Sequence, residues 1–206
     1  MGVAHPLRGA RMADDVPDLY PSEPRAVRLM NTVWADKDGV HDALATTAQL
    51  ERWTAQCGLP DTGRAGAADL DRARTLRGAL RRLAAAAVAD DRRSAVDTAL
   101  SVETALADLN ALMATCTPEL LHGDEGFRHH WRSTAQGFER TLVDLAFEGA
   151  DLLTGTSELP LRACYGPGCV LYFVRNHPRR EWCSSGCGNR ARVARHYQRH
   201  KQSDRA

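Results

Sequence analysis

Apolar residues recur at spacings of three and four along most of the chain, the pattern of amphipathic helices. The clearest helix is predicted over residues 67–89, where an apolar stripe runs between faces of Asp and Arg. The stripe consists of Leu70, Ala73, Leu76, Leu80, Leu83 and Ala87. We interpret it as the face that this helix turns toward a hydrophobic core.

The same periodicity predicts further helices on either side. The first begins at Pro24, which a first turn tolerates, and places Val27, Met30 and Trp34 at helical spacings. The others are predicted over 47–57, 94–115 and 136–153. Between 118 and 131 the helical period disappears, and the glycines of 123–126 favour a short β-hairpin.

These segments predict a mainly α fold with distinct parts. Residues 1–21 contain three prolines and no periodic pattern, so we expect a loose leader, with Met12 as an alternative start. A helical domain is predicted over 22–157, with the short hairpin within it. A compact C-terminal module follows over 158–201, and a tail over 202–206.

Composition decides how the cysteines are interpreted. No apolar run approaches the roughly 18 to 20 residues of a membrane span, and the start of the chain lacks a signal-peptide block. We therefore expect a cytoplasmic protein without membrane contact, in which structural disulfides are rare. Four of the six cysteines cluster near the C-terminus, whereas Cys57 and Cys116 stand apart and are expected to be buried thiols.

The clustered cysteines have the spacing of a metal site. Cys164 and Cys169 are separated by four residues, Cys183 and Cys187 by three, and thirteen residues lie between the pairs. Four thiolates suit one tetrahedral zinc ion, and they leave no position for a catalytic water. Two disulfides or an iron–sulfur cluster are the alternatives.

The residues around the cysteines predict a treble-clef-like module of knuckle, hairpin and helix. Residues 165–168 form the knuckle, and 170–174 form a strand that pairs with a returning strand at 181–182. Ser184 or Ser185 caps a helix carrying Cys187 in its first turn. The module has too few large apolar side chains to form a core of its own. We therefore expect zinc removal to unfold the module and leave the helical domain standing.

Charge divides the chain in the same place. Residues 161–206 contain ten basic and two acidic residues, a net charge of +8, whereas the preceding 160 residues contain 17 basic and 24 acidic, a net charge of −7. A cationic module on an anionic body is typical of a protein that binds a polyanion through that module. The alternative is that the arginines form an ordinary solvent-exposed face that binds no partner.

The helix after Cys187 carries much of this charge. It places Arg192, Arg195, His196 and Arg199 on one face, and Val193, Ala194 and Tyr197 on another that we expect to pack on the zinc hairpin. Arginine suits phosphate and the guanine edge. Arg190 either contacts DNA or binds the knuckle carbonyls. The candidate DNA-binding residues are Arg175, Arg179, Arg180, Arg190, Arg192, Arg195, Arg199 and Lys201.

The C-terminal segment, with Trp182-Cys183-Ser184 and Cys187-Gly188-Asn189-Arg190, resembles the CGNR zinc finger family over 161–201. The N-terminal part is similar to the ABATE domain that usually precedes this finger. The resemblance rests on Asn31-Thr32-Val33, on Leu44, Leu50 and Trp53 before Gly58-Leu59, and on Ala150-Asp151-Leu152-Leu153. It implies a stress-related bacterial transcription regulator. Arg28, where the family commonly has an acidic residue, and the absence of an Asp-x-Ser stretch after Val174 depart from it.

These observations predict a DNA-binding regulator with one structural zinc ion. The helical domain is expected to sense a small-molecule effector, with Asn31 and Thr32 lining a pocket, or to form a homodimer. A zinc-stapled module that binds protein or RNA is the alternative. We expect no enzyme, because His41, His122, His129 and His130 occur without a catalytic motif.

Overall fold

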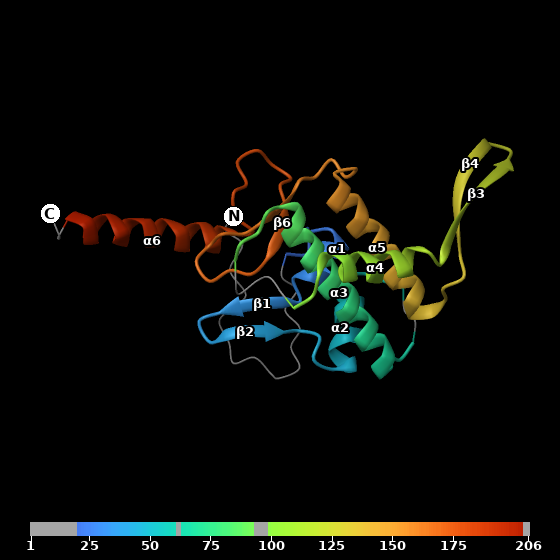
Figure 1. Cartoon of the computed structure of the whole chain (residues 1–206), viewed down its shortest axis with the longest axis horizontal. Coiled ribbons are helices and arrows are strands. Elements are labelled where there is room, and N and C mark those ends of the chain that lie inside the picture. The colour runs from blue at the N-terminus through green and yellow to red at the C-terminus, as the bar shows by residue number, and fades with distance from the viewer. Residues whose placement is uncertain (1–19, 61–62, 93–98, 204–206) are drawn as a thin grey trace.

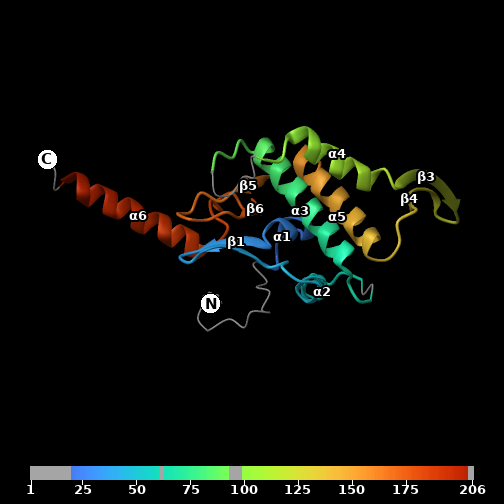
Figure 2. The same ribbon diagram turned by 60° about the horizontal axis from the view of Figure 1, so that its bottom comes forward.

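The helical body is organised around one central helix. The computed structural model describes residues 20–60, 63–92 and 99–203, so most of the predicted leader and tail lies outside the described residues. Helix α3 (Ala67–Ala87) contacts α1 (Arg25–Met30), α2 (Thr47–Gln56), α4 (Val102–Met113) and α5 (Gly137–Thr154). Helices α3, α4 and α5 lie side by side (Figures 1 and 2).

Helix boundaries follow local chemistry. Thr46 and Gln49 form a capping box at the start of α2, and Ser101 accepts a hydrogen bond from the Thr104 N–H at the start of α4. Helix α5 ends at Gly155, whose φ of 75° is the left-handed conformation that favours glycine. Gly149 packs directly on Leu80, and a Cβ there would overlap that side chain, so glycine allows α3 and α5 to approach closely.

The sequence located most of these helices, with two differences. Helix α4 begins at Val102 rather than 94, and residues 93–98 lie outside the described part of the chain. The prediction that Trp34 continues the first helix is wrong. Strand β1 (Val33–Asp36) pairs there with β2 (Gly39–Asp42), and the Trp34 ring stacks on His41 with centroids 4.2 Å apart.

The described residues contain two further two-stranded sheets. Strand β3 (Cys116–Gly123) pairs with β4 (Gly126–Ser133), which confirms the hairpin predicted from the glycines. Strand β5 (Leu161–Ala163) pairs with β6 (Tyr172–Val174). Helix α6 (Ser185–Ser203) then projects from the molecule, at the end opposite the β3–β4 hairpin (Figure 1).

The core continues from the body into the C-terminal module. Leu161, Ala163, Tyr172 and Val174 belong to the same buried apolar cluster as the helices. Phe173, which points to the other side of β6, belongs to a second cluster with the four cysteines and Trp34. Successive residues of one strand therefore bury their side chains in two different cores.

Candidate metal centre and nucleic-acid interface

The four predicted cysteines come together at the base of α6. Cys164 directly follows β5, Cys169 closes the knuckle, Cys183 precedes α6 and Cys187 lies in its first turn. All four are buried, and their sulfur atoms lie within 4.8 Å of one another.

This arrangement fits one zinc ion. Thiolates at about 2.3 Å from a tetrahedral zinc lie about 3.8 Å apart. The observed separations are 3.8 Å between the sulfurs of Cys169 and Cys183 and 3.3 Å between those of Cys183 and Cys187. The module therefore holds one structural zinc, which would link the knuckle to the first turn of the helix.

Glycines and a cap bring the ligands close. The Cys169 N–H donates to the Gly166 carbonyl at 2.8 Å, closing the knuckle, and Gly168 has a φ of 72°. A Cβ on Gly166 would lie 2.8 Å from the Cys187 Cβ, closer than real side chains pack. Ser184 accepts a hydrogen bond from the Cys187 N–H at 3.2 Å, which confirms a serine cap at the helix start.

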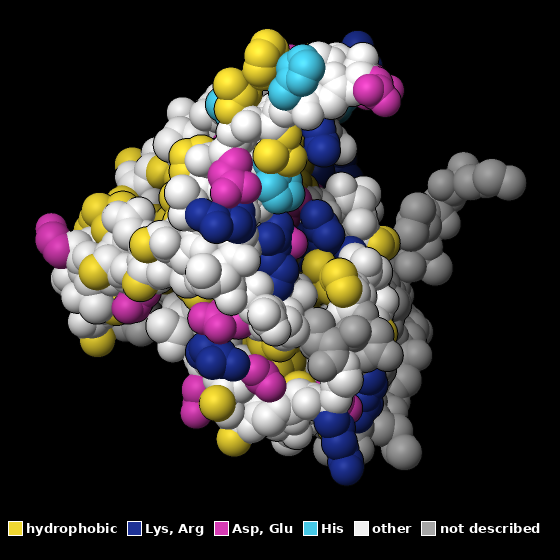
Figure 3. All heavy atoms as spheres, turned by 90° about the vertical axis from the view of Figure 1, so that its right-hand side faces the viewer, with side chains coloured by type: hydrophobic (Ala, Val, Ile, Leu, Met, Phe, Trp, Pro, Cys, Tyr) yellow, Lys and Arg dark blue, Asp and Glu magenta, His cyan; other side chains and the backbone are white. Residues whose placement is uncertain are grey.

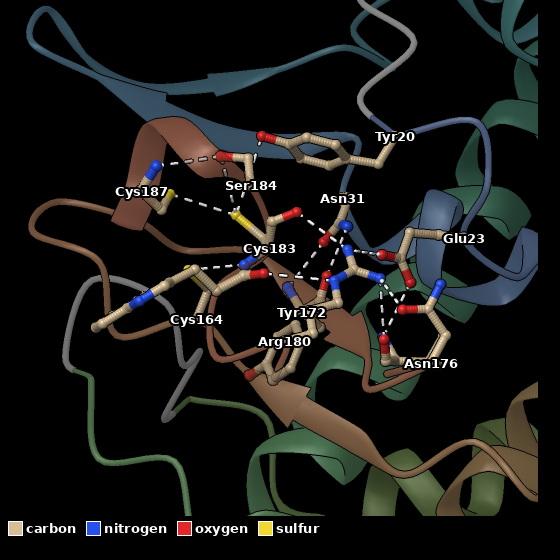
Figure 4. A network of polar contacts seen from close by, with 12 residues as sticks. Tyr20, Glu23, Asn31, Cys164, Tyr172, Asn176, Arg180, Cys183, Ser184 and Cys187 are labelled. Atoms are coloured by element: carbon tan, nitrogen blue, oxygen red, sulfur yellow. Dashed lines mark hydrogen bonds and ion pairs between the residues drawn. The ribbon is translucent and has the colours of Figure 1, made fainter. Parts of the chain in front are cut away.

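The hairpin of the module differs from the prediction. Strand β6 pairs with β5, which precedes the knuckle, and not with residues 181–182. The reason is that Arg180 holds this segment in an irregular turn. Its guanidinium donates to the carbonyls of Val174 and Cys183, both at 3.0 Å, and forms an ion pair with Glu23 (Figure 4).

Arg180 therefore acts inside the protein, which corrects its prediction as a phosphate contact. The Glu23 side chain also accepts a hydrogen bond from the Val174 N–H at 2.9 Å, so it connects the start of the body to β6. Burial raises the pKa of Glu23, although Val174 and Arg180 partly oppose the shift.

Arg190 is an exposed residue whose guanidinium is bound to the knuckle. Its Nε donates to the Pro167 carbonyl at 3.2 Å, and its Nη2 lies 3.0 Å from the Cys187 sulfur. A donor beside a zinc-bound thiolate stabilises the negative charge on sulfur and orients the ligand. Of the two readings that the sequence left open, the geometry supports binding to the knuckle.

Helix α6 leaves the module after one buried turn. Among the α6 residues whose burial is described, Ala191 is the last buried one. The side chains of Arg192, Arg195, Arg199 and Lys201 are exposed, as are those of Arg175 and Arg179 in the preceding loop. The prediction that Val193 and Tyr197 pack on the hairpin is wrong. They are 55% and 70% exposed, because the helix extends past the hairpin into solvent.

A buried polar network that the sequence did not indicate joins the module to the body. Arg92 donates to the carbonyls of Cys164 at 2.8 Å and Cys169 at 3.0 Å, and it forms an ion pair with Asp90 at 2.6 Å. The Tyr172 hydroxyl donates to the same carboxylate at 2.8 Å. Burial opposes ionisation of Asp90, but its bonds with Arg92 and Tyr172 hold the pKa below the usual value.

A second link uses Arg81 from the middle of α3. Its guanidinium donates to the Met30 carbonyl at 2.9 Å and the Val170 carbonyl at 3.2 Å. Desolvation lowers the pKa of Arg81 to about 10, so the side chain remains charged at neutral pH. Two arginines of the body, Arg92 and Arg81, therefore bind the backbone at and next to the first pair of zinc ligands.

Asn31 and Thr32, which were predicted to line a ligand pocket, are both hydrogen-bonded within the protein. The Asn31 side chain donates to the Tyr172 carbonyl at 2.8 Å and accepts from the Tyr172 N–H at 3.0 Å, as a paired strand would. The Thr32 hydroxyl donates to the Leu29 carbonyl and accepts from Arg77. Both side chains are buried and bonded within the protein: Asn31 holds β6 against the end of α1, and Thr32 connects that end to Arg77 of α3.

Taken together, the fold and the cysteine site define a zinc-finger protein whose finger is docked on a helical domain. A family model of the ABATE domain, described as "Putative stress-induced transcription regulator", matches residues 23–156, and a model of the CGNR zinc finger matches residues 161–200. The chain belongs to the ABATE family, with a CGNR zinc finger at its C-terminal end. It is accordingly a regulatory zinc-finger protein by family.

Searches of curated proteins and of solved structures gave no significant match. Within the described residues, no helix is both long enough and apolar enough to cross a membrane.

Proposed function

We propose that this protein is a transcription regulator that binds duplex DNA through α6. The observation that carries the proposal is the exposed basic surface of this helix. Residues 185–203 contain five basic and no acidic residues. Arg192, Arg195 and Arg199 recur at spacings of three and four, so they lie on one face, clear of the helical body.

The dimensions of α6 suit a groove. About 12 residues extend beyond Ala191, a length of roughly 18 Å, and the major groove of B-DNA accepts an α-helix. Arg175 and Arg179 lie in the loop before Cys183, from which they would contact phosphates beside the groove. The acidic body would be repelled by DNA, which leaves the finger as the contacting part.

Zinc has an organising role in this proposal. The four thiolates that would bind it hold the first turn of α6 against the knuckle, and Arg190 connects that turn to Pro167. The helix thereby keeps a fixed direction relative to the body. With four thiolates around the metal there is no coordination position for a substrate, so we propose a structural and not an enzymatic role.

The experiment is fluorescence anisotropy of zinc-loaded protein with labelled duplex DNA from a genomic fragment library, over a salt series. We expect the logarithm of the binding constant to fall by about 0.9 per log unit of salt for each phosphate contact. The triple variant Arg192→Ala, Arg195→Ala, Arg199→Ala should bind more weakly with a shallower slope.

Arg72→Ala is the matched control, because it removes an exposed arginine from α3 of the body. It should leave binding unchanged, and unaltered zinc content should show that the triple variant is folded. If the wild-type protein does not bind duplex DNA at low salt, and no sequence is enriched from the library, the proposal fails. Preference for RNA or for a protein partner would then identify α6 as a different kind of interaction surface.

A further inference from the structure

Helix α6 has one side that faces the zinc module and one that faces solvent. On the inner side Cys187, Gly188 and Ala191 are buried, and Ala194 is half-buried. Gly188 packs on Trp182, since a Cβ there would lie 3.0 Å from the Trp182 Cδ1. With about 3.6 residues per turn, these four helix positions share one side. The module therefore determines which side of α6 a partner cannot reach.

The opposite side of α6 carries Asn189, Val193 and His196. Spacings of four and three residues place these side chains in one row, centred about 180° around the helix from the buried positions. All three residues are exposed, and Val193 is the apolar member of the row. None of them carries a permanent charge. We call them the outer row.

Phosphate-binding side chains flank the outer row on both sides. Arg192, Arg195 and Arg199 follow it along one side, and Tyr197 and Lys201 along the other. All five are exposed. Arginine, lysine and tyrosine side chains donate to phosphate oxygens. Duplex DNA has the complementary arrangement, because the base edges of a groove lie between two phosphate backbones.

We propose that Asn189, Val193 and His196 determine which DNA sequence α6 recognises, an inference that rests on the proposed function of this helix. The major groove is only about 12 Å wide, so the module stays outside it and the opposite side of α6 faces the base edges. At about 1.5 Å per residue the outer row is about 10 Å long, which corresponds to about three base pairs.

The chemistry of the outer row indicates which bases it contacts. An asparagine amide pairs with N6 and N7 of adenine, and an apolar group contacts the C5 methyl of thymine. The site would thus contain an adenine at Asn189 and, about two base pairs away, a thymine at Val193. His196 has a ring N–H that suits the N7 of a purine.

Arg192 connects the outer row to the phosphate contacts. In the free protein its Nη2 donates to the Asn189 Oδ1. A phosphate is a stronger acceptor for a guanidinium than a neutral amide is. When Arg192 binds the DNA backbone, the Asn189 Oδ1 is therefore released to accept from the N6–H of adenine.

The other end of the molecule adds little to this contact. Figure 3 shows the end opposite α6, and on this face basic side chains are interspersed with acidic and hydrophobic ones. A surface of mixed sign attracts a polyanion less than one of a single sign. We therefore expect the sequence preference to come from α6.

Selection of duplexes from a random library by the zinc-loaded full chain tests this inference first. The wild-type chain should enrich one motif that contains the adenine and the thymine. Asn189→Ala, Val193→Ser and His196→Ala should each relax the preference at one position of that motif. The dependence of binding on salt should stay as in the wild type, because the phosphate contacts remain.

Base analogues then identify the individual contacts by fluorescence anisotropy on the selected site. 7-Deazaadenine lacks N7, and deoxyuridine lacks the C5 methyl of thymine. For the wild-type chain, 7-deazaadenine should weaken binding by about tenfold at one adenine, and deoxyuridine should weaken it less at one thymine. Asn189→Ala should not distinguish adenine from 7-deazaadenine, and Val193→Ser should not distinguish thymine from uracil.

Gln198→Ala is the matched control, because Gln198 is an exposed neutral residue of α6 in the row of Ala191 and Ala194. It should keep both analogue effects, and full zinc content should show that each variant is folded. Binding without sequence preference, or analogue effects that persist in Asn189→Ala and Val193→Ser, would overturn this inference and leave the proposed function standing. A wild-type chain that does not bind duplex DNA would overturn both.

Discussion

The helical body and the zinc module are held together by different kinds of interaction. The body buries a continuous apolar stripe of α3 between the other helices, and its helices end at capping residues. The module has few apolar side chains, and its chain is bound by four cysteines and by arginines that donate to backbone carbonyls. The module therefore depends on an ion and on the body, whereas the body carries its own core.

The boundary between these regions runs along a single strand. Tyr172 and Val174 of β6 complete the core of the body, while Phe173 packs with the zinc ligands. For this reason the module is not an independent domain joined to the body by a linker. We expect the body to remain folded without zinc, as the sequence analysis predicted, but to be less stable.

Removal of zinc should have the largest effect. Apparent zinc-binding free energies of small structural sites are about 10 to 16 kcal/mol, far more than the few hydrogen bonds of Arg180 and Arg190 that also hold residues 175–190. Chelation, or Cys183→Ser, should unfold the module and abolish the DNA binding that we propose for α6, as measured by circular dichroism and DNA titration. Cys116→Ser, which replaces a half-buried cysteine outside the cluster, should keep full zinc content.

Arg92→Ala should come next. The substitution removes the cation paired with Asp90 and the donor to two ligand carbonyls, and breaking a buried pair costs about 3 to 5 kcal/mol. Urea denaturation should show this loss, together with weaker zinc retention against a chelator. Arg72→Ala, which breaks an exposed pair, should cost less than about 1 kcal/mol. Equal effects of the two substitutions would contradict the assigned role of Arg92.

Leu80→Ala should destabilise the body without affecting zinc binding. Leu80 is buried against Gly149, so truncation leaves a cavity and should cost about 2 to 5 kcal/mol. The melting temperature should fall while zinc content stays complete, because Leu80 contributes to the body core and not to the cysteine cluster. Loss of zinc at temperatures where the body is still folded would argue against this separation.

Acid should produce the smallest effect, and it is best measured on zinc-free protein, where thiolate protonation cannot interfere. Burial opposes ionisation of Asp42, but hydrogen bonds from Arg77 lower its pKa overall. A lowered carboxyl pKa contributes stability above the unfolded value that is lost as the pH falls through the folded value. Asp42→Asn should therefore flatten the acid limb of the unfolding curve, and an unchanged slope would contradict the role given to this carboxylate.

The sequence predicted those parts of the molecule whose signals are local. Helical spacing located α2, α3 and α5, and the two cysteine pairs defined the metal site. Strand β1 was missed because Val27, Met30 and Trp34 continue a helical spacing, although pairing with β2 determines the structure there. The roles of Arg92, Arg180 and Asn31 depend on partners 72 to 157 residues away, which spacing along the chain does not indicate.

Hydrogen–deuterium exchange of the full chain with and without zinc tests the central claim most directly. The account predicts that zinc removal exposes the amides of 175–190 completely. It should also lower protection in β6, because Arg180, which donates to the Val174 carbonyl, is no longer held in place. Helices α3 and α5 should remain protected, with faster exchange than in the zinc-loaded protein. Unchanged protection of 164–187 after chelation would contradict the claim that zinc organises the finger.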